Sequence, residues 1–267
     1  MVHGKGSLRA AFFLSFVLTP VPAFAGEEQL APFTPWHVEW TDKTCVMRRG
    51  FGDEKHFVVL QIERFAPTDS FQLVVTGDRL TYLRQGWRFL VSYGDRAPGK
   101  VRYYQIGKTD KGVASVFLSS SSLAPEDEHG EPSPPVTPEM EAATKTVNLE
   151  WSDKRLVLKT GPLDKAFAAL RACTDDLVKT WGLDPAVQQS LSRQATPKND
   201  PAFWARPEDY PLDALRRGEQ AIVSFRLSVD VTGKPTACDV QRSYSGKLFD
   251  TYTCDLLMKR ALRTRAR

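Results

Sequence analysis

The fold of the chain's last part is decided by the stretch VSFRLSVDVTGKP, residues 223–235. Its first seven residues alternate between apolar and polar side chains, which is the period of a strand with one buried face. The next four, DVTG at 230–233, are typical of a hairpin turn. After the turn, Thr236, Cys238 and Val240 share one face of a returning strand. We therefore expect a two-stranded antiparallel hairpin here.

A helix is expected on each side of this hairpin. Pro211 is predicted to open a short helix that ends at Gly218, because proline is favoured in a first turn and glycine just past a helix end. On the second helix, Cys254 lies close enough to pack back on Cys238. The residues that mark the apolar face of this second helix recur at helical spacing: Phe249, Thr253, Leu256 and Leu257.

The order of these features resembles the TonB C-terminal domain family. YPLDALRRG (210–218) is similar to the family's first helix, and AIVSFRLSVDVTGKP (221–235) to its first strand and turn. VQRSYSG (240–246) and LFDTYTCDLLMKRA (248–261) resemble its second strand, connection and second helix. The resemblance implies a module that recognises an extended segment of an outer-membrane transporter by adding it to a sheet edge, without catalysis. It also implies a bridge between Cys238 and Cys254.

The resemblance places the partner-binding residues near the start of the module. Tyr210, Pro211, Leu215 and Gly218 are the candidates, and the partner would be an outer-membrane transporter or another envelope protein. The alternative is that the Tyr-Pro pair only starts a helix and packs its ring. The sequence stops at Arg267, where the family continues into a third strand. The domain is therefore expected to lack its last strand, and either to form a homodimer through the open sheet edge or to bind more weakly. The alternative function is a non-transducing envelope scaffold or a self-associating structural protein.

The first 25 residues have the pattern of a secretory signal peptide. A basic start with Lys5 and Arg9 is followed by an apolar run at 10–18 and by the small-residue pattern Ala23-Phe24-Ala25. The apolar run is short of the roughly 20 residues that span a bilayer. We therefore expect a periplasmic protein, with an uncleaved inner-membrane anchor as the alternative.

Residues 26–193 are predicted to form a mainly antiparallel β domain that is closed by a helix. Short alternating runs indicate its strands, and turn signals such as 50–53 and 77–78 separate them. Residues 119–138, rich in proline, serine and acidic residues, are predicted to be a mobile surface loop. Residues 194–207 are expected to be a linker to the C-terminal domain at 208–267. Three stretches also resemble a β-rich region that accompanies such domains in exported proteins: WTDKTCVMRRGFG (40–52), RFAPTDSFQLVVTG (64–77) and CTDDLVKTWGLDP (173–185).

A long helix is predicted near the end of this domain, and the four cysteines of the chain are predicted to form disulfides. Apolar residues from Phe167 to Trp181 fall on one helix face, which ends before Gly182 and carries Cys173 toward the sheet. In an exported protein an even number of cysteines favours disulfides. With two domains, pairing inside each gives Cys45–Cys173 and Cys238–Cys254. Four free thiols are the alternative, and zinc is disfavoured because no CxxC spacing exists.

Composition and motifs narrow the function. The chain is 42% hydrophobic and 25% charged, which is typical of a globular protein, and its net charge of +4 is too small and dispersed to indicate nucleic-acid binding. It contains no Gly-x-Ser-x-Gly elbow, HExxH motif or phosphate loop. We therefore expect a protein that is not an enzyme and has no catalytic residues, metal or cofactor.

Overall fold

The computed structural model describes residues 1, 26–101, 103–125, 134–191, 195–244 and 247–261. It is an α+β protein whose sheets are mostly antiparallel, as expected. The predicted signal peptide and the acidic part of the predicted loop, 126–133, lie outside the described residues, Met1 excepted. No helix in the described ranges is both long and apolar enough to cross a membrane.

A six-stranded antiparallel sheet has the order β2-β3-β4-β5-β9-β8. Along β5, buried side chains alternate with half-buried ones, so one face of the sheet points into the core. The strands are β2 (His37–Trp40), β3 (Cys45–Gly52), β4 (Phe57–Arg64), β5 (Phe71–Gly77), β8 (Tyr104–Lys108) and β9 (Ala114–Ser121).

A five-stranded sheet faces the first and has the order β1-β11-β10-β6-β7. Only β1 runs parallel to its neighbour, pairing Gly26 with Lys154 and Leu30 with Leu158. The strands are β1 (Gly26–Leu30), β6 (Phe89–Tyr93), β7 (Gly99–Lys100), β10 (Val147–Trp151) and β11 (Lys154–Leu158).

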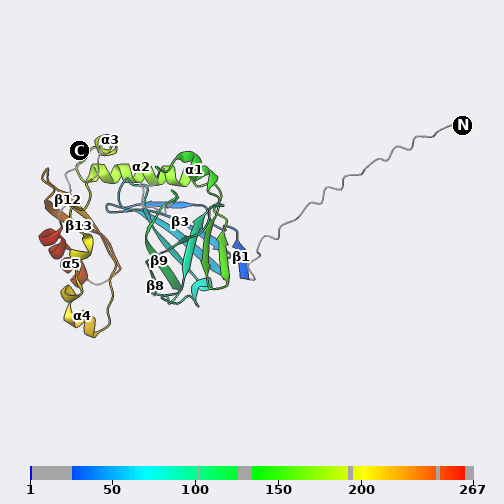
Figure 1. The fold of residues 1–267 in the computed structure, drawn as a ribbon, viewed down its shortest axis with the longest axis horizontal. Helices are drawn as coiled ribbons and strands as arrows, with labels where there is room; N and C mark the ends of the chain where they lie inside the picture. The colour runs from blue at the N-terminus through cyan, green and yellow to red at the C-terminus, as the bar shows by residue number, and fades with distance from the viewer. Residues whose placement is uncertain (2–25, 102, 126–133, 192–194, 245–246, 262–267) are drawn as a thin grey trace.

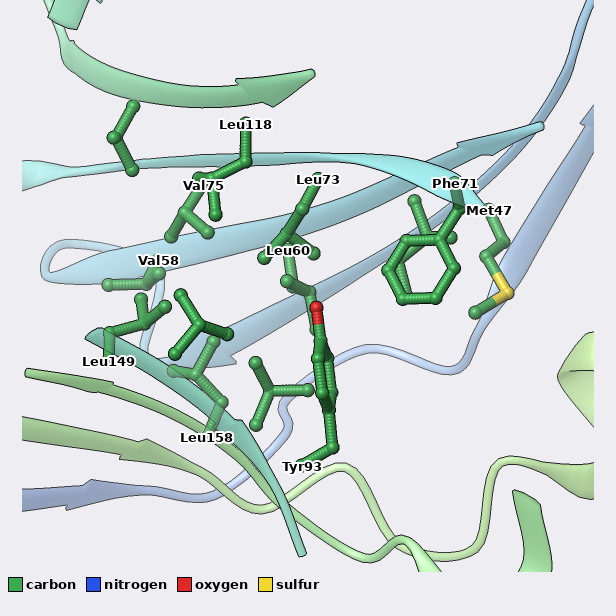
Figure 2. Close-up of a cluster of buried hydrophobic side chains, with 14 of the residues drawn as sticks. Met47, Val58, Leu60, Phe71, Leu73, Val75, Tyr93, Leu118, Leu149 and Leu158 are labelled. Carbon is green, nitrogen blue, oxygen red and sulfur yellow. The ribbon is translucent and has the colours of Figure 1, made fainter. Parts of the chain in front are cut away.

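The space between the two sheets is the main hydrophobic core. Leu60, Leu73 and Leu118 come from the six-stranded sheet and are almost fully buried, and Leu149 and Leu158 meet them from the other. Figure 2 shows these side chains pointing toward one another from opposite sheets. The two sheets therefore form a sandwich.

The long helix α2 (Asp164–Thr180) lies across one end of the sandwich, beside the short α1 (Pro138–Ala143) (Figure 1). Its buried face includes Cys173, which is bonded to Cys45 at the start of β3 with a Cα–Cα distance of 5.9 Å. Gly182 follows with a φ of +74°, the left-handed conformation that ends many helices. The predicted helix and its disulfide are confirmed. The next helix, α3 (Pro185–Gln189), is capped by Asp184.

The rest of the chain, residues 195–244 and 247–261, is called the C-terminal module below. It contains a two-stranded antiparallel sheet flanked by helices and lies beside the sandwich (Figure 1). Its elements are η2 (Pro201–Phe203), η3 (Pro207–Asp209), α4 (Leu212–Arg216), β12 (Val223–Val229), β13 (Pro235–Ser243) and α5 (Lys247–Arg260).

One predicted turn is a strand. Residues 50–52, read as part of a turn, belong to β3, and Phe51 is fully buried. Gly50 serves close packing, since a Cβ there would lie 2.6 Å from the ring of Phe33. The chain turns one step later, between Asp53 and His56, whose amide donates to the Asp53 carboxylate at 2.8 Å.

Two irregular segments also differ from expectation. The predicted loop at 119–138 is shorter, because 119–121 extend β9 and Thr137 caps α1. The segment predicted as a linker, 194–207, is a packed part of the C-terminal module over its described residues, 195–207. Trp204 is only 5% exposed there, and the Asn199 side chain donates to the carbonyl of Arg260 at 3.0 Å. The buried side chain of Trp204 therefore holds this segment in place, although its apolar residues follow neither a helical nor a strand period.

Candidate functional site

The hairpin of the C-terminal module presents one face to α5. Phe225 and Leu227 of β12 pack with Trp204 and Leu257 in a small hydrophobic cluster. Cys238 joins them from β13 and is bonded to Cys254 of α5, with a Cα–Cα distance of 5.5 Å. The second predicted disulfide is therefore also confirmed. Because the cluster is small, this bond supplies a large share of the module's stability.

The opposite face of the hairpin docks on the six-stranded sheet. Gln241 donates to the carbonyl of Phe65 at 2.9 Å, and Gln72 donates to the Ser224 hydroxyl at 2.7 Å. The Arg226 guanidinium lies 4.6 Å from the centre of the Trp181 ring. Since both faces of the hairpin are in use, a partner has access to its strand edges and to the surface beyond α5.

Tyr210 and Pro211 lead the chain into α4. Pro211 has a φ of −59° and occupies the N-cap position. The Tyr210 ring packs edge-on against Phe249 of α5, with 5.5 Å between ring centres, and its hydroxyl donates a short hydrogen bond to the carbonyl of Glu219. Tyr210 thus joins the entry of α4 to α5 and to Glu219, which lies between the end of α4 and the hairpin.

The other two predicted binding residues lie at the far end of α4. Gly218 has a φ of +65° and its amide donates to the carbonyl of Leu215 at 3.1 Å, so it terminates the helix. Leu215 is 60% exposed. Neither residue borders the groove described next, so the structure brings together only the Tyr210–Pro211 half of the predicted site.

A groove of about 480 Å³ opens between the entry to α4 and α5. Tyr210 and Pro211 form one wall, and Leu248, Tyr252 and Leu256 of α5 form the other. Leu212 stands at its border with 67% of its surface exposed. The aliphatic and aromatic side chains of its walls are suited to apolar side chains of a partner.

The rim of the groove is acidic. Glu208, Asp209 and Asp213 lie around it. Asp209 accepts two hydrogen bonds from Arg260, at 2.5 and 2.8 Å. Together with the amide of Arg206, this arginine lowers the pKa of Asp209 to about 2. Asp209 therefore stays ionised at any physiological pH with Arg260 as its counterion, whereas the exposed carboxylates of Glu208 and Asp213 favour a partner with a basic residue beside its apolar ones.

Four apolar groove residues, Leu212, Leu248, Tyr252 and Leu256, were not predicted as site residues from the sequence. Leu212 and Leu215 are spaced three apart on a helix whose buried residue is Ala214, so both leucines point away from the core. The exposed face of α4 was a signal that could have found Leu212. Leu248 and Tyr252 lie four residues apart on α5, off the stripe that packs on the hairpin.

Other polar clusters are sparse in the described ranges, where no group of three or more histidine, cysteine, aspartate or glutamate side chains could hold a metal ion. His56 pairs with Asp78 at 3.0 Å on the surface, with both side chains well exposed. His37 lies on β2, away from this pair. The groove in the C-terminal module is therefore the candidate functional site.

The chain was compared with models of protein families, with curated proteins and with solved structures, and none of them matches it.

Proposed function

We propose that this chain is a periplasmic TonB-like binding module of the outer-membrane transport machinery, which captures an extended segment of a transporter or another envelope protein and catalyses no reaction. The observation that carries the proposal is the groove of Tyr210, Pro211, Leu248, Tyr252 and Leu256. It coincides with the Tyr-Pro region where the resemblance to TonB C-terminal domains puts partner binding. Two disulfides support an oxidising compartment such as the periplasm.

Recognition would combine two kinds of contact. The outer edges of β12 and β13 have no strand partner in the described part of the chain, so each offers backbone donors and acceptors to an added strand. The groove would take one or two apolar side chains of that strand, and the acidic rim would attract a basic neighbour. Backbone hydrogen bonds give affinity, whereas the groove and rim give the choice of sequence.

Calorimetric titration of the disulfide-bonded protein with ten-residue peptides from the periplasmic segments of outer-membrane transporters tests this function. We expect saturable binding, with a dissociation constant no weaker than about 100 µM for at least one peptide, or about −5.5 kcal/mol. Leu212→Asp should weaken binding at least about tenfold, because it places a charge at the apolar border. Val187→Asp is the matched control, since Val187 is 53% exposed on α3, outside the groove.

Two outcomes contradict the proposal. One is the absence of saturable heat for every peptide up to about 1 mM. The other is equal binding by the Leu212→Asp and Val187→Asp proteins, which would show that the peptide does not bind in the groove.

A second candidate function is an envelope scaffold that associates with itself. The same unpaired edges of β12 and β13 favour it, because an exposed edge can pair with a second copy. Light scattering at increasing concentration separates the two functions. A dimer that forms without peptide supports the scaffold, whereas a strict monomer that binds peptide supports the transport module.

A further inference from the structure

The sandwich has a cleft of its own, far in sequence from the C-terminal module. It opens between β6 and β7 of one sheet and β9 of the other, and has a volume of about 680 Å³. The strand β7 is only two residues long and pairs with Leu90 and Val91 of β6, so the five-stranded sheet ends early on this side. The volume of the cleft lies within the range of about 300–1,000 Å³ that small-molecule sites occupy.

The floor of the cleft is continuous with the main core. Val91, Tyr93 and Leu118 line it and belong to the buried cluster between the sheets, and Val101 packs against that cluster. Figure 2 shows the Tyr93 ring standing between the two sheets. An alkyl chain that entered the cleft would therefore contact core side chains on both sides and leave water behind, which is the main source of affinity for apolar ligands.

Among the described lining residues, Arg96 is the charged side chain that borders this apolar floor. The Nε atom of Arg96 donates to the carbonyl of Tyr93 at 3.2 Å, and the guanidinium lies 6.0 Å from the centre of the Tyr93 ring. These contacts hold the group in place and use one of its five N–H donors. In the described part of the chain, its two Nη groups have no protein partner. The loss of hydration on partial burial lowers the pKa of Arg96.

The rest of the polar lining is neutral. Ser119 and Ser120 are exposed at the end of β9, and Ser121 shares a short hydrogen bond with the hydroxyl of Tyr93. The described lining residues include no aspartate or glutamate. Hydroxyls and a fixed guanidinium, with no carboxylate among the described lining residues, favour a single negative charge and disfavour a cation.

We propose that this cleft binds an amphiphile with one anionic group, a carboxylate or a phosphate ester, whose oxygens pair with the Nη groups of Arg96. Its alkyl chain lies against Val91, Val101 and Leu118. The site is separate from the groove of the C-terminal module and does not depend on the function proposed for that groove.

Calorimetry on the full-length, disulfide-bonded protein tests the site with four probes below their micelle concentrations. The probes are dodecanoate, dodecyl phosphate, dodecanol and inorganic phosphate. We expect the two anionic amphiphiles to bind at least about tenfold more tightly than dodecanol and inorganic phosphate, because only they satisfy both the guanidinium and the apolar floor. The tighter of the two anionic probes identifies the source of the anion, a fatty acid or a phosphate ester.

Variants assign the binding to named residues. Arg96→Gln should weaken both anionic probes at least about tenfold and leave dodecanol unchanged, and Arg96→Lys should restore part of the loss. Ala97→Trp, at an exposed lining position, should block all amphiphiles by filling the cleft. Arg88→Gln is the matched control, since Arg88 is exposed outside the lining. Thermal melting of each variant checks that it folds.

Three results would overturn the proposal. The first is no binding of either anionic amphiphile up to about 1 mM. The second is equal weakening by Arg96→Gln and Arg88→Gln. The third is inorganic phosphate that binds as tightly as dodecyl phosphate, which would reduce the site to an anion contact without an apolar floor.

Discussion

At the scale of single residues, the main exception to an apolar core is a buried group of charges beneath α2. The Arg64 guanidinium lies 4.9 Å from the centre of the Phe167 ring, and the residue is 2% exposed. Glu141 is fully buried and accepts a short hydrogen bond from Arg171. Burial lowers the pKa of Arg64 to about 10, and the charges of Asp69 and Glu141 oppose that fall. Glu141 therefore compensates two arginines.

Removal of this carboxylate should be strongly destabilising. Glu141→Ala removes the ion-pair partner of Arg171 and leaves Asp69 as the remaining opposing charge near the buried Arg64, so we expect a loss of about 3–5 kcal/mol in the free energy of unfolding. Urea titration followed by circular dichroism measures it. Glu139→Ala, at an exposed position in the first turn of α1, is the control and should lose less than about 1 kcal/mol. Similar losses in both variants would show that Glu141 contributes nothing beyond its place in the helix.

At the scale of elements, each disulfide joins a helix to a strand. Cys45–Cys173 closes a loop across 128 residues, and Cys238–Cys254 closes one across 16. The entropy that a cross-link removes from the unfolded chain grows with loop length, which gives about 5 kcal/mol for the first bond and about 3 kcal/mol for the second.

We therefore expect the double variant Cys45→Ala/Cys173→Ala to unfold at a lower denaturant concentration than Cys238→Ala/Cys254→Ala. The loss from the second pair should be confined to the C-terminal module, whose own cluster is small. Urea unfolding with hydrogen exchange on each module separates the two effects. If the Cys238→Ala/Cys254→Ala protein were the less stable of the two, loop length would not be what determines the contribution of each disulfide.

Substitution by alanine is expected to have opposite effects on stability at two glycines in strands, Gly77 and Gly107. A Cβ at Gly77, the last residue of β5, would lie 2.5 Å from the backbone oxygen of Phe57 in the paired strand, so Gly77→Ala forces the strands apart. We expect a loss of about 1–3 kcal/mol in stability. At Gly107 in β8 nothing lies within 4 Å, and Gly107→Ala should be neutral or stabilising by up to about 1 kcal/mol. Thermal unfolding compares them, and a neutral Gly77→Ala would disprove the packing argument.

The elements that the sequence predicted well are those with local signals. The apolar stripe of α2 ends at Gly182, Asp184 caps the next helix, and β5 alternates between buried and half-buried residues. The strand β3 was missed because Gly50 gives the same local signal whether it turns the chain or makes room for Phe33. The parallel strand β1 could not be predicted, since its pairing with β11 joins segments more than 100 residues apart.

At the scale of the whole molecule, the C-terminal module is held by a polar network that no sequence pattern reveals. Glu63 of β4 is fully buried, and its carboxylate lies 3.1 Å from Nε of Arg242 and accepts from the Tyr244 hydroxyl at 3.2 Å. Glu63 and Tyr244 are 181 residues apart in sequence. In β4, Glu63 shares a strand face with the half-buried Val59 and Gln61, opposite the core residues Leu60 and Ile62, so nothing local in the sequence marks it as buried. Half of the candidate site was missed for the same reason, because the groove forms only when α4 meets α5.

This network should make docking of the module depend on pH. Burial raises the pKa of Glu63 above its ordinary value of 4.5, and the charge of Arg242 opposes the rise only in part. Burial also raises the pKa of Tyr244 to about 12, so its hydroxyl stays protonated and donates to Glu63. An acid whose pKa is higher in the docked state binds its proton more tightly there. Docking is therefore most favourable below pH 4.5 and weakens as pH rises through the raised pKa.

Small-angle scattering measures this dependence as the radius of gyration between about pH 4 and pH 8, a range in which the fold of the sandwich is expected to persist. We expect the radius to increase with pH in the wild-type protein, as modules undock from the six-stranded sheet. Glu63→Gln keeps a hydrogen-bonding side chain and removes the titrating charge, so its radius should stay small and constant. Glu54→Gln, an exposed carboxylate in the turn before β4, should behave as the wild type. Identical curves for the wild type and Glu63→Gln would show that the buried carboxylate does not govern docking, and that Gln72, Gln241 and Arg226 hold the module independently of pH.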